Sequence, residues 1–240
     1  MTPLKSISTF ISRSIAISLL LLVFSSQTLP AQRPRKKADI EKERMKHIDD
    51  SIPWYRGIQV KVDAVSLIQL AVSDYGQYEA GVRVNLKDKY FPVMELGLGK
   101  ADHNDDVTGI HYHSSAPYAK IGMDFNILKN KHDIYRTYIG VRYAATYFKY
   151  DVEHANLPDP VWGGTVPFQE NGIKANYHWM ELLAAIDAKI YGPLHLGWSV
   201  RYKRRIFHDD GSLGNVWYVP GYGKQGSTRL GGTFDIILEF

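Results

Sequence analysis

The chain has 240 residues, no cysteine and a formal net charge of +4 at pH 7. Without cysteine it has neither a disulfide framework nor a cysteine-linked lipid anchor. Much of the small positive charge comes from Arg33, Arg35, Lys36 and Lys37, so the charge does not indicate a nucleic-acid partner. A hydrophobic fraction of 45% suits a soluble domain, but it also suits a transmembrane barrel, in which only alternate residues face lipid.

The first 31 residues have the layout of a secretory signal peptide. Lys5 and Arg13 precede an apolar run at residues 15–24, and small and polar residues follow it as far as Ala31. The run is shorter than the roughly 20 residues that an anchor helix needs to span a bilayer. We therefore predict export, with cleavage after Ala31. A charged segment follows at residues 32–56, and its few apolar residues indicate a solvated periplasmic tail or short helix.

From residue 57 onward, apolar and polar residues alternate as they do in β-strands with two different faces. Residues 66–72 break the alternation, and we interpret them as the upper end of the first strand with a bulge. The predicted strands cover residues 57–65, 78–86, 91–99, 118–128, 134–150, 179–191, 194–207 and 228–240.

The connectors between these strands are of two kinds. Those at 87–90, 129–133 and 192–193 are short, and those at 100–117, 152–178 and 209–227 are long. Short turns on one side and long loops on the other are typical of outer-membrane barrels. We therefore predict an all-β fold, an eight-stranded antiparallel transmembrane β-barrel of the outer membrane over residues 57–240. The alternative is a soluble sandwich or lipocalin-like barrel, whose apolar faces point inward with the same alternation.

The last strand carries an apolar row that ends on an aromatic residue. Phe234, Ile236, Leu238 and Phe240 occupy every second position. This pattern resembles the insertion signal of bacterial outer-membrane barrels, which implies that outer-membrane lipid and the barrel-assembly machinery are partners of the chain.

Charged residues recur on the opposite face of the strands, and eight of them are positive and eight negative. The interior of an eight-stranded barrel is just filled by side chains, so charges there must pair with one another or with water. The balance predicts a closed, salt-bridged lumen formed by Lys61, Asp63, Glu79, Arg83, Glu95, Lys120, Asp124, Arg136, Arg142, Glu181, Asp187, Lys189, Arg201, Lys203, Asp235 and Glu239.

Residues 78–86, residues 90–99 and the terminal strand resemble an uncharacterised family of small Bacteroidetes outer-membrane β-barrels. The resemblance covers roughly residues 54–240, and the architecture is also similar to OmpX-like and OmpW-like barrels. It implies a place in the outer membrane and a barrel shape. It carries over no active site, because these segments are patterns of a fold.

Two histidines and two serines are candidates for chemistry near the rim. His111 and His113 would lie on one side of an extended segment, a spacing that metals use, with Asp102, Asp105 and Asp106 nearby. The alternative is that they are polar loop residues in water. Ser114 and Ser115 beside His113 are compatible with a lipid-modifying enzyme, but no nucleophile motif supports one. No cofactor is predicted.

The long loops are rich in aromatic residues and proline, a composition that suits contact with an extracellular glycan or protein. The alternative is that these aromatic side chains pack on one another or form the outer girdle. We predict a structural or surface-interaction protein, with a lipid-modifying enzyme or a narrow pore as alternatives. The candidate contact residues are Trp162, Phe168, Trp217, Tyr218 and Tyr222.

Overall fold

The computed structural model describes residues 35–159, 161–214 and 216–240, so the predicted signal peptide at residues 1–31 lies outside the described residues. The chain divides into two compact units, Met1–Ser51 and Ile52–Phe240. The described part of the first unit is helix α2 (Arg35–Ser51). Of the two predicted alternatives, a solvated tail or a short helix, the structure has the helix. Within the described ranges, no helix is both long enough and apolar enough to cross a bilayer.

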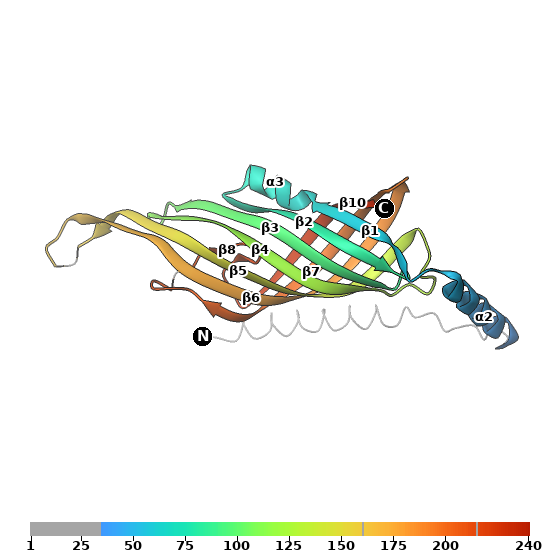
Figure 1. Ribbon diagram of the computed structural model, residues 1–240. Coiled ribbons are helices and arrows are strands. Elements are labelled where there is room, and N and C mark those ends of the chain that lie inside the picture. Colours follow the sequence, from blue (N-terminus) through green and yellow to red (C-terminus); the bar gives the residue numbers. More distant parts are fainter. Residues whose placement is uncertain (1–34, 160, 215) are drawn as a thin grey trace, which may run out of the picture. The chain divides into compact units, whose positions relative to one another are not determined.

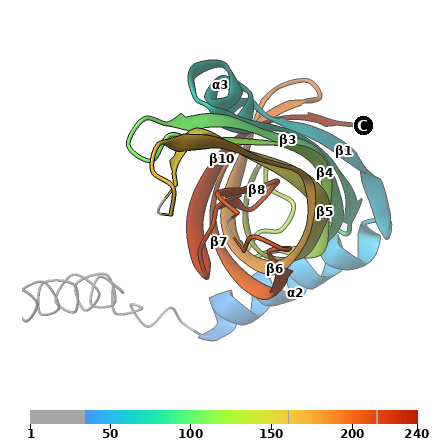
Figure 2. The same ribbon diagram turned by 90° about the vertical axis from the view of Figure 1, so that its left-hand side faces the viewer.

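The second unit is a closed barrel of eight antiparallel strands, as predicted (Figures 1 and 2). Each strand pairs with its neighbour in sequence, and the last strand closes the ring against the first. The strands are β1 (Tyr55–Asp63), β2 (Tyr75–Leu86), β3 (Tyr90–Asp105), β4 (Ile110–Asn126), β5 (Tyr135–Pro158), β6 (Thr165–Tyr191), β7 (Leu194–Asp209) and β10 (Thr228–Glu239).

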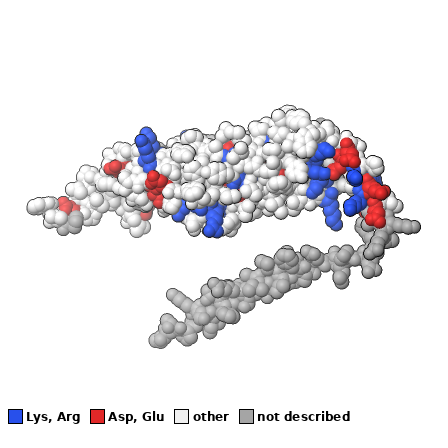
Figure 3. Space-filling model, turned by 60° about the horizontal axis from the view of Figure 1, so that its bottom comes forward, with Lys and Arg blue, Asp and Glu red and all other residues white. Residues whose placement is uncertain are grey.

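The two faces of the wall show which environment the barrel is built for. Charged side chains such as Arg142 and Glu181 are fully buried inside, whereas Leu182, Ile121 and Val200 are more than half exposed outside. The visible side of the barrel carries few charged groups over its middle (Figure 3). A soluble barrel would have the reverse arrangement, so this one is a transmembrane barrel with lipid-facing apolar residues.

Exposed aromatic side chains gather at the end of the barrel that has the short turns. All of them lie at strand ends, where a membrane barrel places the aromatic girdle that sits at the level of the lipid head groups. They are Trp54, Tyr55, Tyr90, Phe125, Tyr135, Tyr191 and Phe240.

Residues 66–72 are not the bulged end of the first strand, and this prediction is wrong. They belong to helix α3 (Ala64–Val72), which begins directly after β1. Asp63 caps the helix: its Oδ1 accepts a hydrogen bond from the Val65 N–H at 3.1 Å, and its Oδ2 accepts one from the Ser66 hydroxyl. An apolar run without alternation fits a short helix better than a strand with two faces.

Two of the predicted long loops are mostly strand. β3 and β4 continue to a turn at residues 106–109, β5 continues as far as Pro158, and β6 begins at Thr165. In these extensions the alternation reverses, because aromatic residues such as Tyr112 and Tyr177 face inward and polar residues face outward. The third predicted long loop contains the small hairpin of β8 (Tyr218–Val219) and β9 (Gly223–Lys224).

Candidate functional site

Most of the predicted lumen charges lie inside the barrel. Fourteen of the sixteen are buried, and the side chain of Glu239 is 17% exposed. Lys189 is the exception and its prediction is wrong, because it is exposed. It lies beside the irregularity at Lys189/Tyr191 and the β6–β7 turn, where the wall no longer surrounds the side chain.

The middle of the lumen is crossed by a layer of arginine–aspartate pairs. Arg142 makes two hydrogen bonds to Asp124, at 2.6 and 2.8 Å. Arg83 lies 3.1 Å from the same carboxylate and 2.7 Å from Asp187. Gly140 makes room for this layer, since a Cβ atom there would lie 1.9 Å from Asp124 Oδ1.

On the side of this layer that is farther from the short turns, glutamates and cations alternate around the lumen. Glu95 lies 2.6 Å from Lys61 Nζ and 3.0 Å from Arg201 Nη1. Lys120 Nζ lies 2.8 Å from Glu79 and 3.1 Å from Glu181. These contacts connect side chains of β1, β2, β3, β4, β6 and β7 across the lumen.

At the end with the short turns, Glu239 receives two hydrogen bonds from Arg136, at 2.8 and 3.1 Å, and lies 3.0 Å from His195 Nε2. Asp88 is also fully buried and lies 2.8 Å from His132 Nδ1. His195 and Asp88 belong to the lumen but were missed. The alternation of β7 places His195 inward, whereas Asp88 lies in a turn, where alternation gives no information.

Part of the third predicted long loop lies inside the other end of the barrel (Figure 2). Tyr218 and Tyr222 are buried in the mouth, and β8 lies across the ring when the barrel is viewed along its axis (Figure 2). Tyr218 donates a hydrogen bond to the Gly76 carbonyl at 3.0 Å, and Tyr112 donates one to the Tyr218 carbonyl at 2.8 Å. Lys203 Nζ donates to the Gly221 carbonyl at 2.7 Å. We call residues 216–224 the plug.

The predicted contact residues therefore separate into two groups. Tyr218 and Tyr222 are buried inside the mouth, so they do not form an exposed contact surface. Trp217 is half-buried and stacks on His103 with 4.1 Å between ring centroids. Phe168 also packs against the buried aromatic cluster. Only Trp162, which is 88% exposed in the turn between β5 and β6, is free to meet a partner.

The two histidines of the predicted metal site at the rim both lie near the carboxylate of Asp102. His111 Nε2 lies 2.8 Å from Asp102 Oδ1, and His113 Nδ1 lies 3.6 Å from Oδ2 of the same carboxylate. Among the residues that the structure describes, no group of three or more potential ligands could hold a metal ion. The hydrogen bond with His111 lowers the pKa of Asp102. Ser114 faces the interior, whereas Ser115 is exposed on the same outer face as His113.

The predicted assembly row lies on the outer face of β10, where Ile236, Leu238 and Phe240 are exposed. Phe234 is half-buried and packs against Trp198, with 4.7 Å between ring centroids. The backbone of Phe240 pairs with that of Ile58 in β1, with N···O distances of 2.8 and 2.9 Å. The last residue of the sequence therefore takes part in closing the barrel.

A family model described as "Domain of unknown function (DUF6048)" matches residues 7–240. Among solved structures, the chain is similar to Neisserial surface protein A, at 11% identity and a TM-score of 0.40, over 78% of this chain and 99% of that chain. It is similar to a major outer membrane protein from Thermus thermophilus, at 13% identity and a TM-score of 0.43, over 77% and 100% of the two chains. A third is Ail, the attachment invasion locus protein of Yersinia pestis, at 8% identity and a TM-score of 0.37, over 77% and 98%. No curated protein matches the chain.

Proposed function

The chain belongs to the DUF6048 family, and we propose that it is a non-conducting outer-membrane barrel that acts at the cell surface through the projecting hairpin of β5 and β6. The observation that carries the proposal is the burial of paired charges in the middle of the lumen, together with the buried aromatic side chains of the plug at its mouth.

The ion pairs favour a closed lumen for an energetic reason. A buried charge is costly unless it is paired and hydrogen-bonded. Arg142, Asp124 and Glu95 are wholly buried, and Arg142 lies 2.6 Å from Asp124 on the neighbouring strand β4 and 3.5 Å from Glu95 on β3. Opening a water-filled path would break several of these pairs together. The pore alternative therefore requires a rearrangement of the interior, while the surface alternative requires none.

The β5–β6 hairpin supports a role in surface contact. It is formed by the two longest strands, of 24 and 27 residues. Its turn exposes Trp162 and Val161, which are 88% and 75% exposed. Large apolar side chains at the tip of a projecting element are costly in water and favourable in an interface. The partner class that fits this tip is an extracellular protein or glycan.

Several parts of the proposal concern the route to the membrane. Export with cleavage after Ala31, delivery by the barrel-assembly machinery and the Bacteroidetes origin are expectations from the sequence and its resemblances. The proposed periplasmic side is the end with the short turns, where the aromatic girdle and Phe240 lie.

Closure is tested by electrical recording. Purified protein in planar bilayers should give no steady single-channel conductance, while a porin prepared in the same detergent serves as the positive control. A variant in which a short Gly-Ser linker replaces the plug should also stay closed, because the ion-pair layers remain below it. A reproducible channel from the intact protein contradicts the proposal and favours the pore alternative.

Surface contact is tested separately. Whole cells that carry the protein should retain a defined protein or glycan, and shortening the β5–β6 hairpin by residues 156–167 should abolish that retention. The matched control is Trp162→Ser, which removes the largest exposed ring and keeps the hairpin. If retention is unaffected by both changes, the hairpin is not the contact element. Unequal lipid A composition with and without the protein would instead favour the enzyme alternative.

A further inference from the structure

The barrel wall is incomplete at one place. The pairing of β1 with β10 ends at Asp63↔Asp235, and the pairing of β1 with β2 ends at Val62↔Ala80. Beyond these points the chain leaves the wall as α3. Over residues 228–234, β10 pairs with β7 on one side and with no described strand on the other.

Helix α3 covers only part of this gap. It packs against β2, where Gly76 lets it approach closely: a Cβ atom there would lie 2.6 Å from Leu70 Cα. Gln77 of β2 also donates a hydrogen bond to the Ser66 hydroxyl at 3.3 Å. On the other side, the Asp63 carboxylate accepts a hydrogen bond from the Phe234 N–H at 3.2 Å. Above that contact, a cleft remains between α3 and β10.

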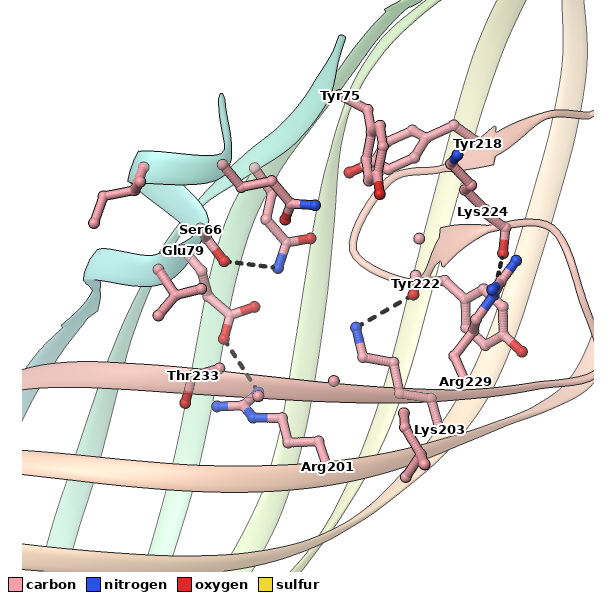
Figure 4. Close-up of a pocket in the computed structure, with 18 of the residues that line it drawn as sticks. Ser66, Tyr75, Glu79, Arg201, Lys203, Tyr218, Tyr222, Lys224, Arg229 and Thr233 are labelled. Atoms are coloured by element: carbon pink, nitrogen blue, oxygen red, sulfur yellow. Dashed lines mark hydrogen bonds and ion pairs between the residues drawn. The ribbon is translucent and has the colours of Figure 1, made fainter. Parts of the chain in front are cut away.

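The cleft has a volume of about 570 Å³ and is lined by α3, β10, the plug and the upper lumen (Figure 4). This volume is in the range of sites for small organic ligands. Gly231 and Gly232 of β10 lie along it and leave its side open. Both faces of its outer edge are apolar: Ile68 and Val72 on α3 and Leu230 on β10 are 63%, 78% and 76% exposed.

The inner part of the cleft is positively charged. Its charged lining consists of one carboxylate, Glu79, and five cations: Lys120, Arg201, Lys203, Lys224 and Arg229. Lys120 and Arg201 are neutralised by the glutamates of the lumen. The other three cations are the ones available to a ligand.

These three cations are held mainly by neutral groups. Lys203 Nζ binds two carbonyl oxygens of the plug, and its carboxylate partner Glu181 lies 3.9 Å away. Lys224 lies over the rings of Tyr75 and Trp217, at 5.2 and 4.8 Å from their centroids. Arg229 donates to the carbonyl oxygens of Lys224 and Gln225. Within the described part of the chain, neither Lys224 nor Arg229 forms a salt bridge.

The cleft lies at the edge of the lipid-facing surface. Leu230 pairs with Tyr202 across β10 and β7, and two residues earlier Thr228 pairs with Arg204, which is exposed. The apolar surface therefore gives way to charged residues at this height. An amphiphile in the outer leaflet has its head group at the same boundary.

We propose that this cleft binds a single-chain anionic amphiphile from the membrane. Its phosphate or carboxylate head binds Lys203, Lys224 and Arg229, and its alkyl chain lies along the apolar edge of α3 and β10. Charge-assisted hydrogen bonds hold the head, and burial of the methylene groups holds the chain. A phosphate without a chain buries no methylene groups, and a neutral chain makes no charge-assisted hydrogen bonds.

The test uses the full barrel in nanodiscs of zwitterionic phosphatidylcholine and a dodecyl phosphate with a photoreactive diazirine at the chain end. Illumination should label residues 64–72 and 228–233. Unlabelled dodecyl phosphate should compete about tenfold more effectively than dodecanol, and inorganic phosphate should not compete. Even labelling of all lipid-facing strands, or equal competition by dodecanol or by inorganic phosphate, contradicts the proposal.

Variants separate the cleft from the general surface. Gly231→Leu fills the cleft beside Lys203, since a Cβ atom at Gly231 lies 3.7 Å from Lys203 Cε, and it should abolish the labelling. Lys224→Gln with Arg229→Gln should weaken competition by dodecyl phosphate about tenfold, which also tests the proposal if Gly231→Leu does not fold. Arg204→Gln removes a cation outside the cleft and should change nothing. A loss with Arg204→Gln equal to that of the double variant would show surface electrostatics instead of a site.

Discussion

Arg142 and Asp124 face each other across β4 and β5 as a two-bonded ion pair, and neither side chain is exposed. The pair is also part of a larger layer, because Asp124 is shared with Arg83 and Arg142 lies 3.5 Å from Glu95. The pair and these two partners come from four different strands, β2 to β5. Loss of one member therefore leaves a charge inside the barrel that water cannot reach.

We expect Arg142→Met to destabilise the barrel by about 3–5 kcal/mol, because Asp124 and Glu95 stay buried and each loses one of its cations. The measurement is urea-induced unfolding in detergent, followed by tryptophan fluorescence and by the mobility shift of folded barrels on gels. Lys189→Met is the matched control, because Lys189 is exposed and its loss should have little effect. Equal destabilisation by the two variants would show that the ion-pair layer is not what stabilises the interior.

The plug depends on a glycine at a crowded turn. Gly221 has φ +80°, and a Cβ atom there would lie 2.5 Å from the ring of Tyr118. Gly214 in the same connection has φ +63° but nothing within 4 Å. Alanine is strained by roughly 1–2 kcal/mol in both conformations, and only Gly221→Ala adds overpacking.

We therefore expect Gly221→Ala to loosen the plug and Gly214→Ala to leave it ordered. Hydrogen exchange of the amides in residues 216–224, read by mass spectrometry, should become faster in the first variant only. Both variants should keep the gel mobility of the folded barrel, because the ion-pair layers do not depend on the plug. If exchange rises equally in both, backbone strain alone explains the effect, and the contact with Tyr118 has no special role.

The pair of Asp102 and His111 predicts a local pH dependence beyond the apolar surface. The hydrogen bond with His111 lowers the Asp102 pKa below its ordinary value of 3.8. The pair therefore contributes to stability above that value, and the contribution is lost as the pH falls through the lowered pKa. In carbon-detected NMR titration, Asp102 should titrate below 3.8, and His111→Ala should raise its pKa. An unchanged titration in His111→Ala would show that the hydrogen bond is not formed in solution.

The barrel and much of its interior could be predicted because both depend on a local pattern. In a strand, neighbouring side chains point to opposite faces, so the parity of Glu95 or Arg201 alone places its charge inside. The prediction that Lys189 faces the lumen was wrong because Lys189 lies at a strand end with an irregular register, where alternation does not fix the face. The turn residue Asp88 was missed for the same reason.

The remaining features depend on contacts between segments distant in sequence. Tyr218 looks like an exposed loop residue until it is placed beside Gly76, 142 positions earlier in the chain. The extensions of β3 to β6 were missed because aromatic side chains face inward there, which reverses the polarity used to recognise a strand. α3 was missed because a short apolar run is ambiguous without knowledge of where β1 stops pairing.

The last prediction concerns the closing seam. Phe240 and Ile58 exchange two backbone hydrogen bonds, and a Cβ atom at Gly57 would lie 2.0 Å from the Phe240 oxygen, so the strands meet closely at this point. Deleting Phe240 leaves the N–H and C=O of Ile58 without partners, at several kcal/mol each wherever lipid replaces water.

We expect the deletion of Phe240 to reduce the amount of folded protein in the outer membrane, and Phe240→Tyr to restore it, because tyrosine keeps both the ring and the backbone pairing. Gly57→Ala separates the two proposed roles of Phe240, which are to direct assembly and to close the barrel. This variant disturbs the seam between β1 and β10 but leaves the apolar row of β10 unchanged. If the apolar row is the assembly signal, Gly57→Ala should reach the outer membrane normally and resist unfolding in detergent less well. Cell fractionation with a pulse of labelled protein measures delivery, and gel mobility measures unfolding. If the deleted form reaches the outer membrane at the normal level and only its stability falls, Phe240 closes the barrel but does not direct its assembly.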